Sequence, residues 1–205
     1  MNVWLAFWRG EMMKGQIDEF FYCEHLTDSE EHKRLLSSFN TIRTEGIGLE
    51  YYLKCSAIRD ELSNVARTYL IRDVNNKGLV AYFTLKAGSI TVNEERRFFA
   101  SKFDSLPGIE LANFAVNGSY KEAHKEMTGI GYIVLYYFVK PMLKEVANII
   151  GANIFYIFAL PQETLLKHYM KMNFARLDKR TEKKLHRRIK PRYDERCIFM
   201  YQLIA

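Results

Sequence analysis

The chain is poor in cysteine, and its few cysteines are badly placed for crosslinks. Cys23, Cys55 and Cys197 are far apart, odd in number, and match no common metal-binding spacing. A disulfide framework is therefore excluded, and we predict no bound metal. We expect reduced, mostly buried thiols and a cytoplasmic location.

Long hydrophobic runs are also missing. No apolar run approaches the roughly 20 residues that a helix needs to cross a bilayer. The apolar N-terminal residues 1–8 are shorter than a signal-peptide core, and no small-residue cleavage site follows before Arg9. We therefore expect no membrane partner, and we interpret residues 1–15 as a peripheral extension.

What the chain does have is ample material for a core. It contains 205 residues, and 48% of them are hydrophobic, which is enough for one sizeable buried interior. Internal repeats, low-complexity tracts and linker-like segments are absent. The sequence predicts a single domain over residues 1–205.

Hydrophobic periodicity and turn residues predict an alternating α/β order. A capping-box pattern at Thr27–Glu30 starts one helix, and Asn75–Gly78 suits a tight hairpin. Pro141 predicts a kink or a break near Lys140. The charged and aromatic segment from Ile90 to Asp104 is left without an assigned element, with loop as one interpretation. The predicted strands are 17–23, 68–72, 79–85, 109–116, 153–158, 174–177 and 197–204, and the predicted helices are 27–39, 49–62, 129–150 and 162–172.

One strand leads to a glycine-rich helix start. The apolar strand 109–116 is followed by Thr128-Gly129-Ile130-Gly131, which opens a long apolar helix. The first turn of a helix has unpaired N–H groups and a partial positive charge, and glycine lets a ligand approach closely. The pattern predicts a phosphate-bearing cofactor, with an ordinary turn as the alternative.

From Ala66 to Asp178 the chain resembles the GNAT superfamily of acetyl-CoA-dependent N-acetyltransferases, and within it the toxin-like branch. The likeness depends on the order of four pieces, which are Phe114-Ala115-Val116, Glu126-Met127-Thr128-Gly129-Ile130-Gly131, the strand 153–159, and Tyr169-Met170-Lys171-Met172-Asn173-Phe174. The resemblance implies an α/β fold with a mixed, mostly antiparallel central sheet, splayed strands four and five, and flanking helices. It also implies acetyl-CoA as co-substrate.

The resemblance further implies roles for individual residues. Tyr169 matches the general acid, because a phenol with a pKa of about 10 holds a proton at neutral pH. Glu110 is similar to a carboxylate that some members use as general base. The residues implied in cofactor binding are Phe114, Ala115 and Val116 through their main chain, Met127, Thr128, Gly129, Ile130 and Gly131 around the diphosphate, and Gln162 in place of the family's usual Asn.

These features favour an N-acetyltransferase that moves an acetyl group from acetyl-CoA to a primary amine by direct attack. The acceptor is a small-molecule or peptide amine, or an aminoacyl-tRNA as in the toxin branch. The segment 179–192 holds eight Lys or Arg residues and one Glu, so the rest of the chain is near −1 of the net +6. This segment is either a solvated surface or a site that attracts an anionic acceptor. A homodimer stays open.

A second interpretation is a catalytically inactive GNAT-like module that binds or regulates. Its support is Glu126, an anion where the family usually has Gln or Arg, and the lengthened segment from Val116 to Glu126. A carboxylate beside phosphate repels it unless it turns away or Lys121 and Lys125 compensate. Asn173 replaces a family glycine, and we expect it to adopt the left-handed backbone conformation.

Overall fold

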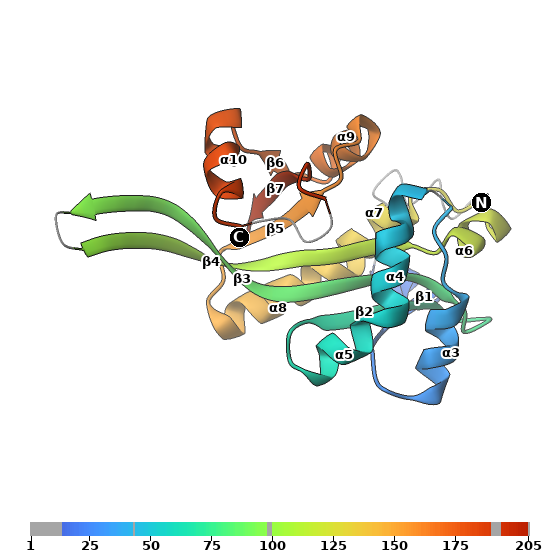
Figure 1. Cartoon of the computed structure of the whole chain (residues 1–205). Coiled ribbons are helices and arrows are strands. Elements are labelled where there is room, and N and C mark those ends of the chain that lie inside the picture. The colour runs from blue at the N-terminus through green and yellow to red at the C-terminus, as the bar shows by residue number, and fades with distance from the viewer. Residues whose placement is uncertain (1–13, 43, 98–99, 190–193, 205) are drawn as a thin grey trace. The chain divides into compact units, whose positions relative to one another are not determined.

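The computed structural model describes residues 14–42, 44–97, 100–189 and 194–204 (Figure 1). The predicted extension over residues 1–15 falls almost wholly outside this range. Among the described residues, no helix has the length and apolar character that crossing a membrane requires. In chain order the elements are α2 (Lys14–Ile17), β1 (Phe21–His25), α3 (Glu30–Ser38), η1 (Thr44–Gly46), α4 (Ile47–Cys55), α5 (Ala57–Leu62), β2 (Arg67–Asp73), β3 (Leu79–Arg97), β4 (Ala100–Val116), α6 (Gly118–Ala123), α7 (Ile130–Val134), the π-helical turn η2 (Leu135–Val139), α8 (Lys140–Ile150), β5 (Ile154–Ala159), α9 (Glu163–Lys171), β6 (Ala175–Arg176), α10 (Lys179–His186) and β7 (Ile198–Leu203).

Seven strands form one mixed sheet in the order β1-β2-β3-β4-β5-β7-β6. The pairs β1–β2, β2–β3, β5–β7 and β6–β7 are antiparallel, and β4–β5 is parallel. The parallel pairing joins only Gly108–Glu110 to Ile154–Tyr156, and no described residue of β4 beyond Glu110 is paired with β5. The predicted mixed sheet, with strands four and five splaying apart, is confirmed.

The chain divides into two compact units. The first contains residues up to Leu85 together with Asn113–Pro141, and the second contains Lys86–Ala112 and Met142–Ala205. A single domain over residues 1–205 stays a prediction.

In the first unit, helices α3, α4 and α5 cover one face of strands β2 and β3 (Figure 1). The Tyr82 hydroxyl donates to the Leu49 carbonyl at 2.6 Å and ties β3 to α4. Helix α3 begins after Ser29, whose hydroxyl accepts from the His32 amide, so the N-cap lies two residues later than the capping-box pattern predicts. The apolar cluster under these helices contains Leu26, Leu36, Phe39, Tyr52, Leu53, Ala57, Leu70, Leu79 and Tyr82.

Two interpretations of secondary structure from the sequence are wrong. The helix expected over 49–62 is two helices, because α4 ends at Cys55 and α5 begins at Ala57. The segment from Ile90 to Asp104 is not loop, since its described backbone continues β3 and β4. A polar composition does not prevent this, because two adjacent strands satisfy each other's backbone groups whatever side chains they carry.

The long helix after the glycine turn is irregular where proline predicts it. It changes from α- to π-geometry over Leu135–Val139 and returns to α-geometry at Lys140. Pro141 has no N–H with which to bond the carbonyl four residues earlier, and its ring crowds that carbonyl. The wider π-turn carries the chain past the missing bond.

In the second unit, α9 and α10 cover opposite faces of β5 and β7 (Figure 1). On the α10 face, Leu185 packs in a cluster with Tyr156 and Phe199. On the α9 face, the ring of Phe155 lies 5.3 Å from that of Phe174. Alternate residues of β5 therefore pack toward α10 on one face and toward α9 on the other.

The three cysteines are free, and Cys55 is exposed rather than buried as expected.

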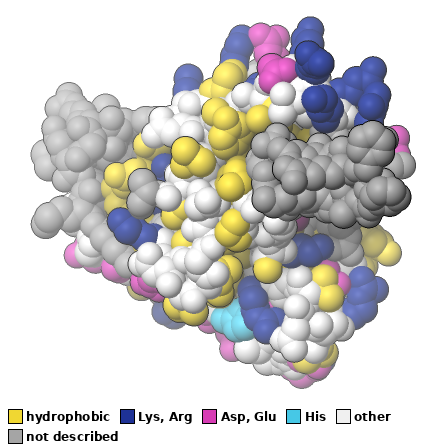
Figure 2. Space-filling view, turned by 90° about the vertical axis from the view of Figure 1, so that its left-hand side faces the viewer, with side chains coloured by type: hydrophobic (Ala, Val, Ile, Leu, Met, Phe, Trp, Pro, Cys, Tyr) yellow, Lys and Arg dark blue, Asp and Glu magenta, His cyan; other side chains and the backbone are white. Residues whose placement is uncertain are grey.

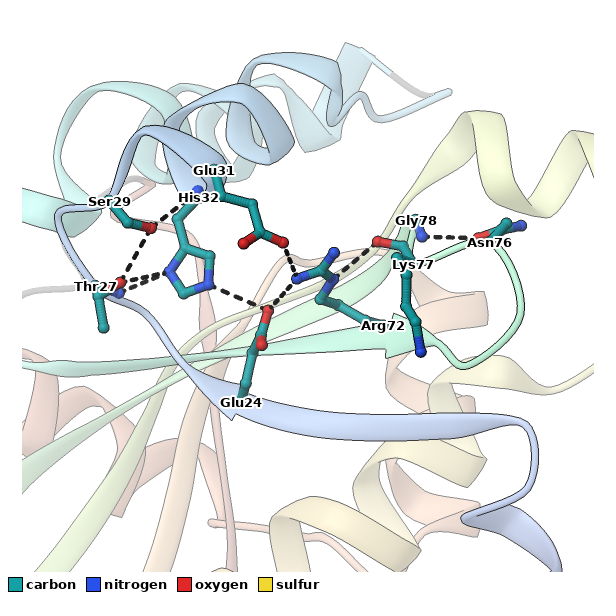
Figure 3. Close-up of polar contacts among 9 residues, drawn as sticks. All are labelled: Glu24, Thr27, Ser29, Glu31, His32, Arg72, Asn76, Lys77 and Gly78. Atoms are coloured by element: carbon teal, nitrogen blue, oxygen red, sulfur yellow. Dashed lines mark hydrogen bonds and ion pairs between the residues drawn. The ribbon is translucent and has the colours of Figure 1, made fainter.

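Arg72 on β2 is the buried centre of an ion-pair network in the first unit (Figure 3). It is 5% exposed. Its guanidinium donates to Glu24 at 2.8 Å and Glu31 at 2.7 Å, and its Nε donates to the Lys77 carbonyl at 2.8 Å. One side chain thus joins β1, α3 and the β2–β3 turn.

His32 extends this network. The Thr27 amide donates to its Nδ1 at 2.9 Å, so the ring carries its proton on Nε2 and donates to Glu24 at 3.2 Å. Glu24 therefore accepts from both His32 and Arg72 (Figure 3).

Replacing Arg72 with methionine keeps most of the side-chain volume but leaves two carboxylates and a carbonyl without their donor. We expect Arg72→Met to lower the free energy of unfolding by about 2–3 kcal/mol, below the usual range for a fully buried pair because Glu31 faces solvent. Urea unfolding measures it. Arg196→Met, which breaks the exposed pair with Asp194, is the matched control and should change stability far less. Equal effects would contradict the network.

Candidate functional site

The predicted phosphate turn forms the start of α7. Gly129 is the N-cap and has a φ of 76°, in the left-handed region that glycine adopts without strain. No side chain caps this helix among the described residues. The Tyr132 and Ile133 amides donate to the Gly129 carbonyl at 2.9 and 3.1 Å. The positive end of the helix is thus free of a side-chain cap, as anion binding requires.

Glu126 is hydrogen bonded within its own segment. Its Oε1 lies 3.3 Å from Nδ1 of His124, and the His124 ring packs on the Tyr120 ring with centroids 4.2 Å apart. The lengthened segment is partly helical, because α6 occupies Gly118–Ala123. The carboxylate that weighed against phosphate binding is therefore hydrogen bonded to the His124 ring.

Helix α6 is fastened to the rest of the first unit. The Tyr120 hydroxyl donates to Oδ2 of Asp73 at 2.6 Å, while the Asn75 and Asn76 amides donate to Oδ1. Burial acts to raise the pKa of Asp73, but these hydrogen bonds outweigh it and lower the pKa. Asp73 therefore stays ionised and holds the β2–β3 turn against the segment that leads to Gly129.

The last residues of β4 present two amides to its open edge. The Asn117 amide donates to the Val80 carbonyl at 2.8 Å, which sets the antiparallel register with β3. Amides in such a ladder alternate in direction, so those of Phe114 and Val116 point away from β3. Phe114, Ala115 and Val116 are all partly buried. The backbone donors implied by the resemblance thus face the edge that β5 leaves unpaired.

Glu110 lies in the second unit, in register with Tyr156 of β5. The Tyr156 hydroxyl is hydrogen bonded to Glu110, and its pKa is raised by burial first and then by the Glu110 charge and hydrogen bond. The Tyr156 phenol therefore keeps its proton and donates the hydrogen bond to Glu110. A Cβ at Gly88 would collide with this hydroxyl. Sequence reasoning missed Tyr156 and Gly88, because only strand register brings them to Glu110.

Tyr169 is 5% exposed on α9. Its ring packs edge-on against Phe174, with centroids 5.4 Å apart and planes at 73°. Burial raises the pKa of its phenol, so the proton stays on the oxygen at neutral pH. Asn173 has a φ of 69°, and its predicted left-handed conformation is confirmed. Tyr169 and the Glu110–Tyr156 pair therefore lie on opposite faces of the sheet in this unit.

The remaining predicted residue, Gln162, is the N-cap of α9 and makes no side-chain cap hydrogen bond. The predicted residues thus fall in two groups. Phe114–Val116 and Met127–Gly131 belong to the first unit, and Glu110, Gln162 and Tyr169 belong to the second. Within the described ranges no three acidic, His or Cys side chains are grouped to hold a metal ion.

No family model and no curated protein matches the chain. Solved structures do. A tyrosine-to-phenylalanine variant of the toxin AtaT, bound to the C-terminus of the antitoxin AtaR, is 15% identical over 90% of this chain and 92% of that chain, with a TM-score of 0.60. A tyrosine-to-phenylalanine variant of KacT is 14% identical over 90% and 95%, with a TM-score of 0.64.

A third similar structure, AtaTR bound with acetyl-CoA, is 15% identical over 91% of this chain and 94% of that chain, with a TM-score of 0.61. Identities this low establish architecture alone. The chain has the fold of the GNAT acetyltransferase toxins.

Proposed function

We propose that this protein is an N-acetyltransferase that transfers the acetyl group of acetyl-CoA to a primary amine. The carrying observation concerns the described residues. Among them, β4 has no pairing with β5 beyond Glu110, and it leads to a helix start that no side chain caps. The edge offers the Phe114 and Val116 amides to an extended amide chain. The helix start suits a diphosphate.

The similar structures support acetyl-CoA as the co-substrate. One of them holds acetyl-CoA, and two others are variants in which a tyrosine has lost only its hydroxyl. Several are complexes with an antitoxin or with DNA, so a protein antitoxin is a candidate partner here.

The chemistry assigns separate tasks to the two catalytic candidates. Acetyl-CoA supplies an acetyl thioester. The amine nitrogen forms a bond to the acetyl carbon, and the carbon–sulfur bond breaks. Glu110 accepts the proton that the amine loses, and Tyr169 donates the proton that the departing sulfur needs.

Titration with acetyl-CoA by calorimetry tests the proposal. We expect binding by the wild type and loss of binding in Gly131→Asp, because the substitution adds bulk and negative charge beside the diphosphate. Gly15→Asp is the control, since a Cβ at Gly15 meets nothing within 4 Å. A wild type that gives neither heat nor a thermal shift would favour the inactive binding or regulatory module instead.

The role of Tyr169 is tested by removing its hydroxyl alone. Tyr169→Phe should lower kcat by about 100-fold, the usual size of a general-acid contribution, while the Kd for acetyl-CoA stays unchanged. CoA release is measured with spermidine, kanamycin, glycinamide and aminoacyl-tRNA as acceptors. Tyr136→Phe, at a half-exposed tyrosine on η2, is the control. Equal turnover in both variants would remove Tyr169 from the mechanism.

An aminoacyl-tRNA is the acceptor that one further observation favours. Helix α10 turns Glu182, Leu185 and His186 inward and exposes its cations. In the view of Figure 2, Lys and Arg side chains gather along the upper part of the molecule, at the height of α10 in Figure 1. Such a row attracts a phosphate backbone. The exposed cations of α10 and of the two residues after it are Lys179, Arg180, Lys183, Lys184, Arg187 and Arg188.

Salt dependence separates this acceptor from a small amine. Lys183→Ala with Lys184→Ala should weaken tRNA binding and reduce the slope of log K against log salt by about 2, one for each lost phosphate contact. The control pair, Lys54→Ala with Lys167→Ala, removes lysines that already pair with Glu50 and Glu163. An unchanged slope in the α10 variant would leave the solvated-surface interpretation.

A further inference from the structure

Asn113 on β4 is a buried polar side chain with an unsatisfied acceptor. It is 2% exposed, and no described residue forms a hydrogen bond with its Oδ1. Buried amide oxygens nearly always have a partner, because leaving one unpaired disfavours the folded state. This atom therefore calls for an explanation.

The position of Asn113 can be fixed from strand register in the first unit. The Asn117 amide bonds the Val80 carbonyl, so an unbroken antiparallel ladder places Asn113 across from Thr84. Thr84 in turn pairs with Thr68 of β2. The three residues form a polar row that crosses three adjacent strands at one level.

This row interrupts an otherwise apolar face. Residues two positions away on the same strand share a face of the sheet. On this face the neighbours of the row are Leu70, Tyr82 and Ala115, which belong to the apolar cluster under α3–α5 or pack against it. Thr68 and Thr84 are fully buried and satisfy each other, with Oγ1 atoms 3.0 Å apart. Asn113 ends the row, and its Oδ1 has no such partner among the described residues.

Asn113 also belongs to the stretch of β4 that β5 leaves unpaired. The amides of Phe114 and Val116 point to the open edge. Asn113 directly precedes Phe114 and lies three residues before Val116. An extended ligand along this edge would pass beside the Asn113 side chain. Acetyl-CoA has such a part, since its pantetheine arm contains two amide groups, each with an N–H donor.

We propose that Asn113 Oδ1 accepts a hydrogen bond from an amide N–H of the pantetheine arm of acetyl-CoA. The inference rests on the proposed function and adds a side-chain contact to the backbone contacts of β4. It also explains the unsatisfied oxygen, because binding completes a hydrogen bond that folding leaves open. Asn113 would then make the site selective for ligands that contain the arm.

The test compares a ligand with the arm and one without it. Acetyl-CoA is titrated by calorimetry into wild type and Asn113→Leu, and ADP, which has a diphosphate but no arm, is measured by displacement of acetyl-CoA. Asn113→Leu should weaken acetyl-CoA binding about 10-fold, the effect of one lost hydrogen bond. ADP affinity should stay the same.

Thermal unfolding distinguishes a ligand contact from a structural one. Asn113→Leu removes an unsatisfied polar group, so Tm should hold or rise by about 2–4 °C. Thr84→Val is the matched control from the same row. It breaks a satisfied pair and should lower Tm without changing acetyl-CoA affinity.

Three results would overturn the inference. They are an unchanged acetyl-CoA affinity in Asn113→Leu, an equal loss of ADP and acetyl-CoA affinity, or a lowered Tm that shows Asn113 to be a structural residue. A wild type that binds neither ligand would instead remove the proposed function, and the role of Asn113 with it.

Discussion

The pairing of β4 is the constraint on which the rest depends. Backbone N–H and C=O groups of a strand need partners, and β4 finds them on β3 along one edge. On the other edge, pairing with β5 ends at Glu110. The next six residues thus have one strand edge that pairs with no described strand. The proposed contacts of Phe114 and Val116 with the cofactor follow from this unfinished edge.

Features controlled by neighbouring residues could be predicted from the sequence. The β2–β3 hairpin follows from Asn75–Gly78, the irregular helix from Pro141, and the left-handed residue after α9 from Asn173. Each depends on the backbone preference of one or a few residues. The central strand and the glycine turn were predictable for the same reason, since apolar runs and glycines act locally.

Features that depend on register could not be predicted. The Glu110–Tyr156 contact exists because the two strands pair at that level, and the room for it comes from Gly88 on a third strand. The polar row that ends at Asn113 has the same origin. The strand character of Ile90–Asp104 was missed because its support is pairing between β3 and β4 rather than its own composition.

The π-helical turn at Leu135–Val139 has a consequence for comparing this chain with other proteins. A π-turn holds one more residue than an α-helical path of similar length. A homologous helix without the turn would match this one only across a single-residue gap, a few residues after the phosphate turn. Such a gap shifts the hydrophobic pattern of the helix by one residue. An alignment of the two sequences therefore loses similarity along this helix, while a superposition of the two backbones keeps it.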